Sequence, residues 1–339
     1  MSLWIRLIAW ASIVALHYAV LWASPEAGCC GMGMVDYIEP IWMFHVNEPD
    51  IWLHALLMLS VLVLIPLGSE VSGSKTPWIE VISACLLGLS LLARPVDPRV
   101  LIADDYSIRR IVPLGFVLSV PWLWVRARAA VPVVVGWLRH GSSNHDRLCL
   151  ESAQVFPAIG AAWIVAHRAN WAPWGFDPLI VLLTAAHFHH AGFTLPLMAG
   201  LNAKASPGFC TKLSCVLILL GVPLVAVGIT GTHFGVLKFS EPFGVAILVL
   251  GALGVAVSQV WRGLEGQRTI LARIGFLLSG ASLFAAMMLA LGFGLRYVIP
   301  NFALTMPQMW AIHGTLNAFG FGLCGILAWR GEVKRSGLP

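Results

Sequence analysis

Histidine is the residue type in this chain whose number and placement point most directly to chemistry. There are 11 histidines beside only 16 acidic residues. A lipid-facing scaffold has no use for histidine, whereas an imidazole inside a membrane can carry protons or bind a metal ion. The densest group is His187, His189 and His190, and His313 stands in a second apolar segment. These four residues are therefore the first candidates for a functional site.

Helical geometry divides the three neighbouring histidines between two directions. At about 100° per residue, His187 and His190 are adjacent on one face, because three residues make nearly a full turn. His189 points roughly 200° away from His187, toward another neighbour or the backbone. Three further polar residues are expected along the His187 face, because their spacing nearly returns to the same angle: Asp177, Thr184 and Thr194.

His313 and Asn317 form the second half of the candidate site. They are four residues apart in the sequence, so their side chains are stacked on one helix face. The segments that carry His187 and His313 run in the same direction in the predicted topology, so both histidines fall near mid-membrane. A neutral imidazole takes or gives a proton near pH 7, and Asp177 or Asn317 can fix its tautomer. We therefore predict acid–base roles for His187 and His313, supported by Asp177, Thr184 and Asn317.

The same histidines also suit a transition metal. His187 and His190 are a permissible ligand pair on one helix, and His313 would supply a third nitrogen. Asp177 would then be a fourth ligand or would orient one of the histidines. Zn, Fe and Cu all accept such a donor set. The sequence leaves a metal site and metal-free proton chemistry open as alternatives.

The elements that must position these residues are membrane-spanning helices. The chain has 339 residues, of which 58% are hydrophobic and 11% are charged, and its mean hydropathy is +0.83. Soluble domains carry about 25% charged residues. These values exclude a soluble globular protein, and no basic run with interleaved aromatic residues indicates a nucleic-acid partner. The expected partners are membrane lipid and either a lipophilic small molecule or a transported solute.

An all-α transmembrane helix bundle of about ten spans accounts for the apolar segments. A span needs about 20 apolar residues. The candidate segments are 3–23, 51–68, 77–93, 109–125, 150–167, 178–200, 212–231, 242–261, 269–295 and 306–329. The whole chain, 1–339, then forms a single integral-membrane domain. The fourth segment is short, and the apolar stretch 129–138 after it fits either an interfacial helix or part of a bent span.

The distribution of Lys and Arg predicts that both termini are cytoplasmic. With that orientation most of the 21 basic residues fall on the inner side, many of them in a basic loop at 126–148. An outer loop at 24–50 is acidic and contains no Lys or Arg. Glu80 and Glu151, near inner span ends, are expected to reach the headgroups, and His167 at a span end is expected to be solvated. This pattern is typical of a multi-pass protein of a bacterial-type inner (cytoplasmic) membrane.

Two strings in the chain resemble a known family. Residues 176–193 read Phe-Asp-Pro-Leu-Ile-Val-Leu-Leu-Thr-Ala-Ala-His-Phe-His-His-Ala-Gly-Phe, and residues 313–321 read His-Gly-Thr-Leu-Asn-Ala-Phe-Gly-Phe. Both are similar to motifs of the YndJ-like family of bacterial multi-span membrane proteins, whose first motif usually ends His-Phe-His-Tyr. His190 stands here in place of that tyrosine. The resemblance supplies no reaction, although the family is sometimes labelled a transporter. It implies functional weight for Asp177, Thr184, His187, His189, His313 and Asn317.

Three interpretations of the pattern stay open. In the first, the protein is an intramembrane enzyme that acts by acid–base or metal-assisted chemistry on a lipophilic substrate, as an isomerase, cyclase or hydratase does. In the second, it is a proton-coupled membrane transporter. In the third, it is a structural or sensory partner without turnover. Single buried histidines are expected to hydrogen-bond to a neighbouring helix, namely His17, His54 and His233. Candidate aromatic walls of a pocket are Phe188, Trp310 and Phe321.

Overall fold

The computed structural model describes residues 2–23, 48–74, 76–93, 114–141, 144–236, 239–297, 299–300 and 304–336. In these ranges the chain consists of helices and short connections, which confirms the predicted all-α class. The acidic loop predicted at 24–50 lies outside the described ranges except for residues 48–50, which begin a helix.

The number of spans also agrees with the prediction. Nine helical segments in the described ranges are long and apolar enough to cross a membrane, and the shorter helix Trp78–Leu92 is apolar as well. In chain order the helices are α1 (Leu3–Ala23), α2 (Glu48–Leu59), η1 (Ser60–Leu64), α3 (Ile65–Val71), α4 (Trp78–Leu92), α5 (Leu114–His140), α6 (His145–Arg168), η3 (Pro173–Gly175), α7 (Pro178–His190), α8 (Thr194–Ala205), α9 (Phe209–His233), α10 (Ser240–Leu264), α11 (Ile270–Gly294), α12 (Met306–Gln308), η5 (Met309–His313), η6 (Leu316–Leu323) and α13 (Cys324–Ser336).

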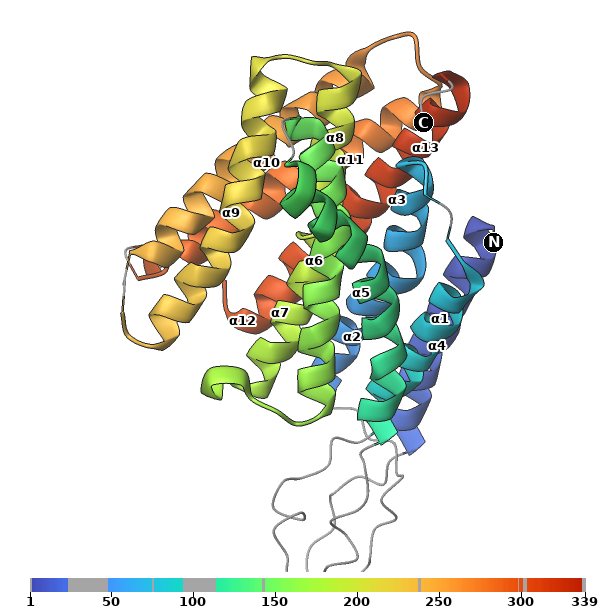
Figure 1. Ribbon diagram of the computed structural model, residues 1–339, viewed down its shortest axis with the longest axis vertical. Helices are drawn as coiled ribbons and strands as arrows, with labels where there is room; N and C mark the ends of the chain where they lie inside the picture. Colours follow the sequence, from blue (N-terminus) through green and yellow to red (C-terminus); the bar gives the residue numbers. More distant parts are fainter. Residues whose placement is uncertain are drawn as a thin grey trace, which may run out of the picture.

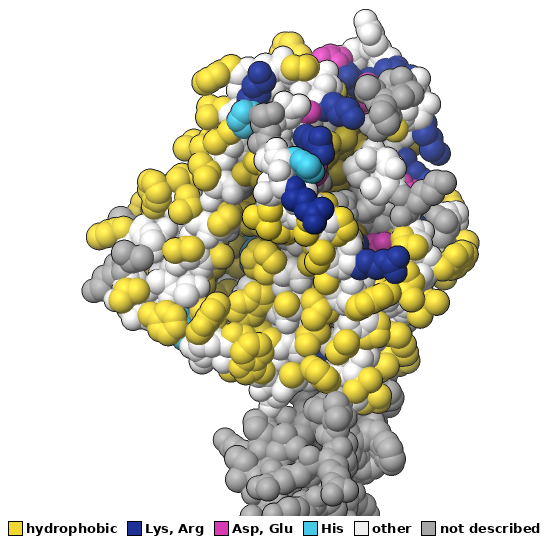
Figure 2. Space-filling view, viewed as in Figure 1, with side chains coloured by type: hydrophobic (Ala, Val, Ile, Leu, Met, Phe, Trp, Pro, Cys, Tyr) yellow, Lys and Arg dark blue, Asp and Glu magenta, His cyan; other side chains and the backbone are white. Residues whose placement is uncertain are grey.

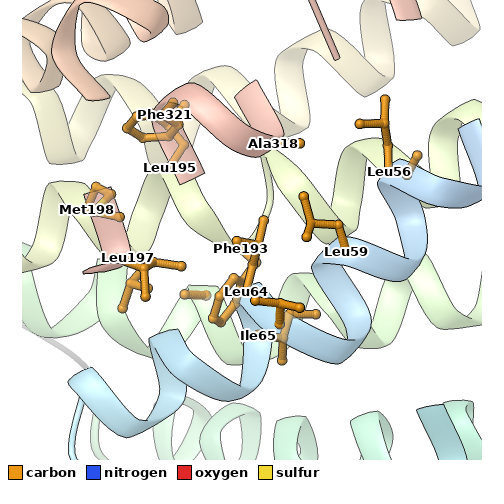
Figure 3. Packing of buried hydrophobic residues seen from close by; sticks show 14 of the residues in the cluster. Leu56, Leu59, Leu64, Ile65, Phe193, Leu195, Leu197, Met198, Ala318 and Phe321 are labelled. Carbon is orange, nitrogen blue, oxygen red and sulfur yellow. The ribbon is translucent and has the colours of Figure 1, made fainter. Parts of the chain in front are cut away.

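The continuous segment α2–η1–α3 is the centre of the bundle. Every hydrophobic side chain from Leu53 to Leu67 is at most 3% exposed. Side chains of η1 and α3, such as Leu64 and Ile65, pack near Phe193 from the α7–α8 connection, in the same core as Phe321 of η6 (Figure 3). A helix that is apolar on all sides is stable only where other helices surround it. This central segment therefore supports both histidine-bearing segments, α7 and η5–η6.

The other helices surround this centre in two groups (Figure 1). Helices α1, α4, α5 and α6 follow one another along one side of the bundle, and α9, α10 and α11 pack in series on the other. Between these groups lie α7, α8 and the segment α12–α13. Counting α4, the described helices make ten passes through the bundle, so α13 ends on the side on which α1 begins. That this side is cytoplasmic stays a prediction.

The structure differs from the prediction in the segment 126–148. Helix α5 is unbroken through residue 140, so most of the expected basic loop is helical and the apolar stretch 129–138 continues the fourth span. Arg126 is accommodated because its Nη1 donates to Glu80 Oε1 at 2.7 Å and its Nη2 donates to Gln154 Oε1 at 3.2 Å. Glu80 is buried in this pair and does not reach the headgroups. The basic residues of this segment therefore have two roles. Arg126 forms an internal ion pair, and Arg139 lies at the end of α5.

The outer surface is suited to lipid. Large hydrophobic side chains point outward from helices in every part of the bundle, for example Trp4, Phe209 and Leu271, each more than 70% exposed. Figure 2 shows hydrophobic side chains over most of one face, whereas Lys, Arg, Asp and Glu gather toward one end. Soluble proteins rarely expose apolar patches of this extent. The surface therefore supports a membrane-spanning bundle.

Candidate functional site

Helix α7, which carries three histidines, begins at a cap provided by Asp177. Asp177 Oδ1 accepts from the backbone N–H of Leu179 at 2.8 Å, and Pro178 occupies the first helical position, where no N–H is needed. Asp177 is exposed at this helix end. At 1.5 Å per residue it lies about 15 Å along the helix from His187. The structure therefore does not bring Asp177 to the histidines, and its carboxylate instead fixes where their helix begins.

His187 presents one free ring nitrogen. Its Nδ1 lies 2.9 Å from the carbonyl O of Leu183, one turn earlier. Because a carbonyl only accepts, Nδ1 carries the hydrogen and Nε2 of the neutral ring is an unprotonated base. The side chain is exposed although it lies far along the helix. Thr184, one turn before His187, donates its hydroxyl to Ile180 O at 2.7 Å and is half-buried.

His190 connects α7 to the central helix. Its Nε2 donates to the carbonyl O of Leu56 on α2 at 2.9 Å. Its Nδ1 is buried and has no hydrogen-bond partner among the residues described. The ring lies within electrostatic range of both His187 and His313. The structure thus brings His187, His190 and His313 into one neighbourhood between α7, α2 and η5.

His313 is held in a single tautomer. Its Nδ1 donates to the carbonyl O of Ala286 on α11 at 2.9 Å, so Nε2 of the neutral ring is an acceptor. Asn317 Nδ2 donates to that Nε2 at 3.1 Å and to the carbonyl O of His313 at 2.9 Å. Asn317 therefore orients the imidazole and fixes its tautomer.

His189 belongs to the packing of the bundle. Its fully buried ring donates from Nδ1 to Ala185 O at 2.8 Å and accepts at Nε2 from Trp122 Nε1 at 2.9 Å. An added Cβ at Gly160 would lie 2.5 Å from His189 Nδ1, so this glycine of α6 leaves the space that the ring fills. The ring contacts α5 and α6 and points away from His187, in the direction that the helical angles predict.

The predicted metal ligands do not converge on one point. In the part of the chain that the structure describes, no three His, Cys, Asp or Glu side chains are close enough together to hold a metal ion. His187 uses Nδ1 in a hydrogen bond, His190 uses Nε2, and His313 uses both nitrogens. A metal at this position would have to displace Asn317 from His313. The geometry fits three neutral imidazoles better than a Zn, Fe or Cu centre.

The sixth span is broken directly after the histidines. Helix α7 ends at His190 and α8 begins at Thr194, with a turn at 191–193 between them. The backbone N–H of Gly192 bonds to His187 O at 3.0 Å, five residues earlier, and the Thr194 hydroxyl donates to His190 O. Thr194 therefore does not continue the His187 face, because the helical angle that predicted it is interrupted by the turn. It is buried at the start of α8.

Other helices in this region also depart from α-helical geometry. The backbone is π-helical in η1, which passes beside α7, and in η5 and η6, which contain His313 and Asn317. Ser60, the first residue of η1, donates its hydroxyl to His189 O at 2.7 Å. Single turns of π-helix are common at functional sites, where they redirect side chains. The irregular backbone thus coincides with the histidine neighbourhood.

The end of helix α9 contacts the segment just before α7. His233 Nε2 donates to the carbonyl O of Trp174 at 3.1 Å, and its ring lies 4.2 Å from the ring of Phe176. Toward its other end α9 packs on α8 and α6. Figure 2 shows a recess on this face, between the α9–α10 pair and the central helices.

The aromatic walls expected for a pocket divide into two kinds. Phe188 and Trp310 are half-buried, and Phe188 packs against Phe156 with ring centroids 6.0 Å apart. Phe321 is 2% exposed and belongs to the hydrophobic core (Figure 3). Phe188 and Trp310 therefore stay candidates for contact with a ligand, whereas Phe321 supports the helix behind them.

His17 and His54, which the sequence predicted as single packing histidines, belong to a second group together with His167, which was expected to be solvated. His17 and His54 lie on neighbouring helices with ring centroids 5.4 Å apart, and His54 is within electrostatic range of His167 and Arg168. In the sequence His17 and His54 are 37 positions apart and His54 and His167 are 113 apart, so no local spacing joins them. The adjacent pair His167–Arg168 at a span end was the one local signal available.

Comparisons with known proteins agree with the motif resemblance. A family model described as YndJ-like protein matches residues 55–321, which is well over half of the chain. The chain is also 32% identical over 184 residues to a Bacillus subtilis (strain 168) protein named uncharacterized membrane protein YndJ. That match covers 52% of this chain and 32% of the relative, so this chain spans about a third of the relative's length. No solved structure matches the chain significantly. On the strength of the family match, the chain belongs to the YndJ-like family of membrane proteins.

Proposed function

We propose that this protein is a membrane-embedded enzyme that moves a proton on a lipophilic small molecule, with His187 as the acid–base group. The observation that carries the proposal is the state of His187. Its Nδ1–H is held by Leu183 O, and its side chain is exposed within a membrane-spanning helix. A neutral imidazole with a free Nε2 is a base suited to neutral pH.

The proposed step is a proton transfer within the substrate. Nε2 of His187 takes a proton from one carbon or oxygen atom, and the resulting imidazolium returns it to another atom of the same molecule. An isomerisation or cyclisation of this kind needs no redox cofactor. His190 Nδ1 and the His313–Asn317 pair are polar neighbours that would stabilise the imidazolium, since each presents a lone pair or an amide dipole.

In this proposal Asp177 and Thr184 position the helix that carries His187 and do not contact the substrate. Asp177 caps α7 and so sets the position of His187, and Thr184 supports the same helix through its bond to Ile180 O. A metal-assisted form of the reaction, with His187, His190 and His313 as ligands, is less well supported. It would require ring rotations that break bonds to main-chain carbonyls and to Asn317.

Proton-coupled transport is the second candidate, and one observation favours it. The helix that carries the histidines is broken at 191–193, next to π-helical turns in η1 and η6. Many transporters bind their solutes near mid-membrane at discontinuous helices. In this version His187 would pick up and release a proton while a solute passes, and no covalent bond of the solute would change.

Reconstituted protein distinguishes the two functions. The purified full chain is placed in liposomes made from a bacterial lipid extract, without any ion gradient, and the extract is followed by liquid chromatography with mass spectrometry, which separates isomers of equal mass by their retention times. In parallel, proton flux is followed with an internal pH-sensitive dye as candidate solutes are added. We expect conversion of an extract component that His187→Gln abolishes and His145→Gln retains, since His145 is exposed at the start of α6.

The other outcomes are equally informative. A solute-dependent proton flux that is lost in His187→Gln, with no chemical conversion, would replace the enzyme by the transporter. If conversion or flux is unchanged in a folded His187→Gln protein, His187 is not the acid–base group and both versions fail.

A further inference from the structure

A group of four nitrogen-bearing side chains lies between α1, α2 and α6, apart from the site around His187. It consists of His17, His54, His167 and Arg168, referred to below as the α1–α2–α6 cluster. His17 and Arg168 are 2% exposed and His54 is 5% exposed. The His17 and His54 rings meet edge to face at 5.4 Å, and His167 and Arg168 are close enough to His54 to interact electrostatically.

Most of the nitrogens in the cluster have no partner. Both ring nitrogens of His54, Nε2 of His17, Nδ1 of His167 and Nε of Arg168 are buried without a hydrogen bond to any residue that the structure describes. Buried polar atoms are nearly always paired, since an unpaired one costs about 1–3 kcal/mol. His17 Nδ1 donates to the carbonyl O of Ile13 at 2.8 Å, so its Nε2 is an acceptor, whereas Nε of Arg168 and one nitrogen of His54 carry hydrogens. These buried donors therefore lack an acceptor.

The fixed charge of the cluster is Arg168. Its Nη2 donates to the carbonyl O of Ala93, and an added Cβ at Gly115 would lie 2.6 Å from the same atom. The guanidinium is therefore held between the end of α4 and the start of α5. Within the described ranges no carboxylate forms an ion pair with it. Two equally buried arginines differ in this respect, because Arg6 contacts Glu70 at 2.9 Å and Arg126 contacts Glu80 at 2.7 Å.

We propose that the α1–α2–α6 cluster binds an oxyanion, namely the phosphate of a lipid headgroup or free inorganic phosphate. An anion supplies acceptors for the Nε–H of Arg168 and the N–H of His54, and its charge compensates the buried guanidinium. A metal cation is excluded by the positive charge of Arg168 in the same group. His17 and His54 lie about 9 Å from the ends of α1 and α2, at 1.5 Å per residue, a depth that a phosphate group can reach from the membrane interface.

This site is separate from the one around His187. His54 and Leu56 are both on α2, and it is the Leu56 carbonyl that accepts from His190. Residues two positions apart on a helix point in directions about 200° apart, so the side chain of His54 points to the other side of α2 from Leu56. The proposed anion site therefore does not depend on the proposed acid–base chemistry, and either proposal can fail without the other.

Ligand-dependent stabilisation tests the proposal. The purified full chain in a neutral detergent is unfolded by heating while tryptophan fluorescence is recorded. One series adds sodium phosphate against sodium chloride of equal ionic strength, and a second adds phosphatidylglycerol against phosphatidylcholine in mixed micelles. We expect a saturable rise of several degrees in the midpoint with phosphate, with phosphatidylglycerol, or with both. A rise in the first series alone identifies free phosphate, and a rise in the second alone identifies a lipid headgroup.

Variants connect the rise to the cluster. Arg168→Gln should abolish it, whereas Arg128→Gln should keep it, because Arg128 is an exposed arginine of α5 beside Trp124. Should Arg168→Gln not fold, His54→Phe keeps the size of the side chain, removes both nitrogens and should weaken the binding at least tenfold. The proposal is overturned if the wild-type midpoint shows no saturable rise, or if the rise persists unchanged in Arg168→Gln or His54→Phe.

Discussion

Two ion pairs with the same distance and different surroundings test how this bundle holds charge. Arg126 Nη1 lies 2.7 Å from Glu80 Oε1, and Arg147 Nε lies 2.7 Å from Glu151 Oε1. The side chains of the first pair are 2% and 8% exposed, whereas that of Arg147 is 72% exposed. Distance alone predicts equal effects when either pair is broken. Burial predicts that only the first is costly to break.

The magnitude follows from the fate of the remaining charge. Glu80→Gln leaves the buried guanidinium of Arg126 without a counter-ion and should lower the free energy of unfolding by about 3–5 kcal/mol. Arg147→Gln removes a contact that solvent already screens and should leave stability almost unchanged. The double variant Glu80→Leu, Arg126→Met removes both buried charges together and should recover much of the loss.

The free energy of unfolding is measured by titrating the protein from neutral detergent into sodium dodecyl sulfate, with tryptophan fluorescence and circular dichroism as independent probes. Coincident transitions from the two probes justify a two-state treatment. Equal losses in Glu80→Gln and Arg147→Gln would refute the reasoning. So would a double variant that is less stable than Glu80→Gln, because the cost would then lie in lost packing and not in the uncompensated charge.

Four further predictions concern packing and metal content. His189→Phe should leave the buried Nε1–H of Trp122 without an acceptor and lower the free energy of unfolding by about 1–3 kcal/mol, while the lipid-conversion assay stays positive; loss of conversion in a folded variant would contradict this. Gly228→Ala should destabilise by about 1–3 kcal/mol, because the new Cβ would lie 2.5 Å from Glu241 Cα. Gly136→Ala, with nothing within 4 Å, should be neutral or stabilising by up to about 1 kcal/mol in the same titration. Elemental analysis should find no stoichiometric Zn, Fe or Cu, and a bound equivalent that is lost in His187→Ala would reverse the metal-free reading.

The fold class was predictable from composition because a lipid environment allows the backbone only a few hydrogen-bonded conformations. With no water to satisfy N–H and C=O groups, apolar segments of about 20 residues must be helices. The boundaries of α5 were not predictable in the same way. Arg126 looks like a loop residue until its partner Glu80 is known, and that partner stands 46 residues away in the sequence. Pro121 and Pro132 inside the same helix also suggest an ending that does not occur.

The site was predictable only as far as one unbroken helix extends. The angles between His187, His189 and His190 hold because all three lie in α7. The count of 100° per residue does not place Thr194 correctly, because the turn at 191–193 interrupts the helix. Asp177 falls on the same broad face as His187, yet an angular argument takes no account of the length of helix between them.

Burial alone does not separate packing histidines from functional ones in this bundle, but the hydrogen bonds of each ring do. Both ring nitrogens of His189 are hydrogen-bonded, one as donor and one as acceptor. The ring can therefore be fully buried without leaving a polar atom unpaired. His190 is half-buried and His54 is 5% exposed, yet one buried nitrogen of His190 and both nitrogens of His54 lack a partner among the residues described. Such atoms oppose folding, so they are expected where a bundle uses them to bind a proton, an anion or a substrate. By this criterion His190, beside His187, and the group around His54 are the candidates for function. The two differ in chemistry because, among the residues described, only the second contains a buried arginine without a carboxylate partner.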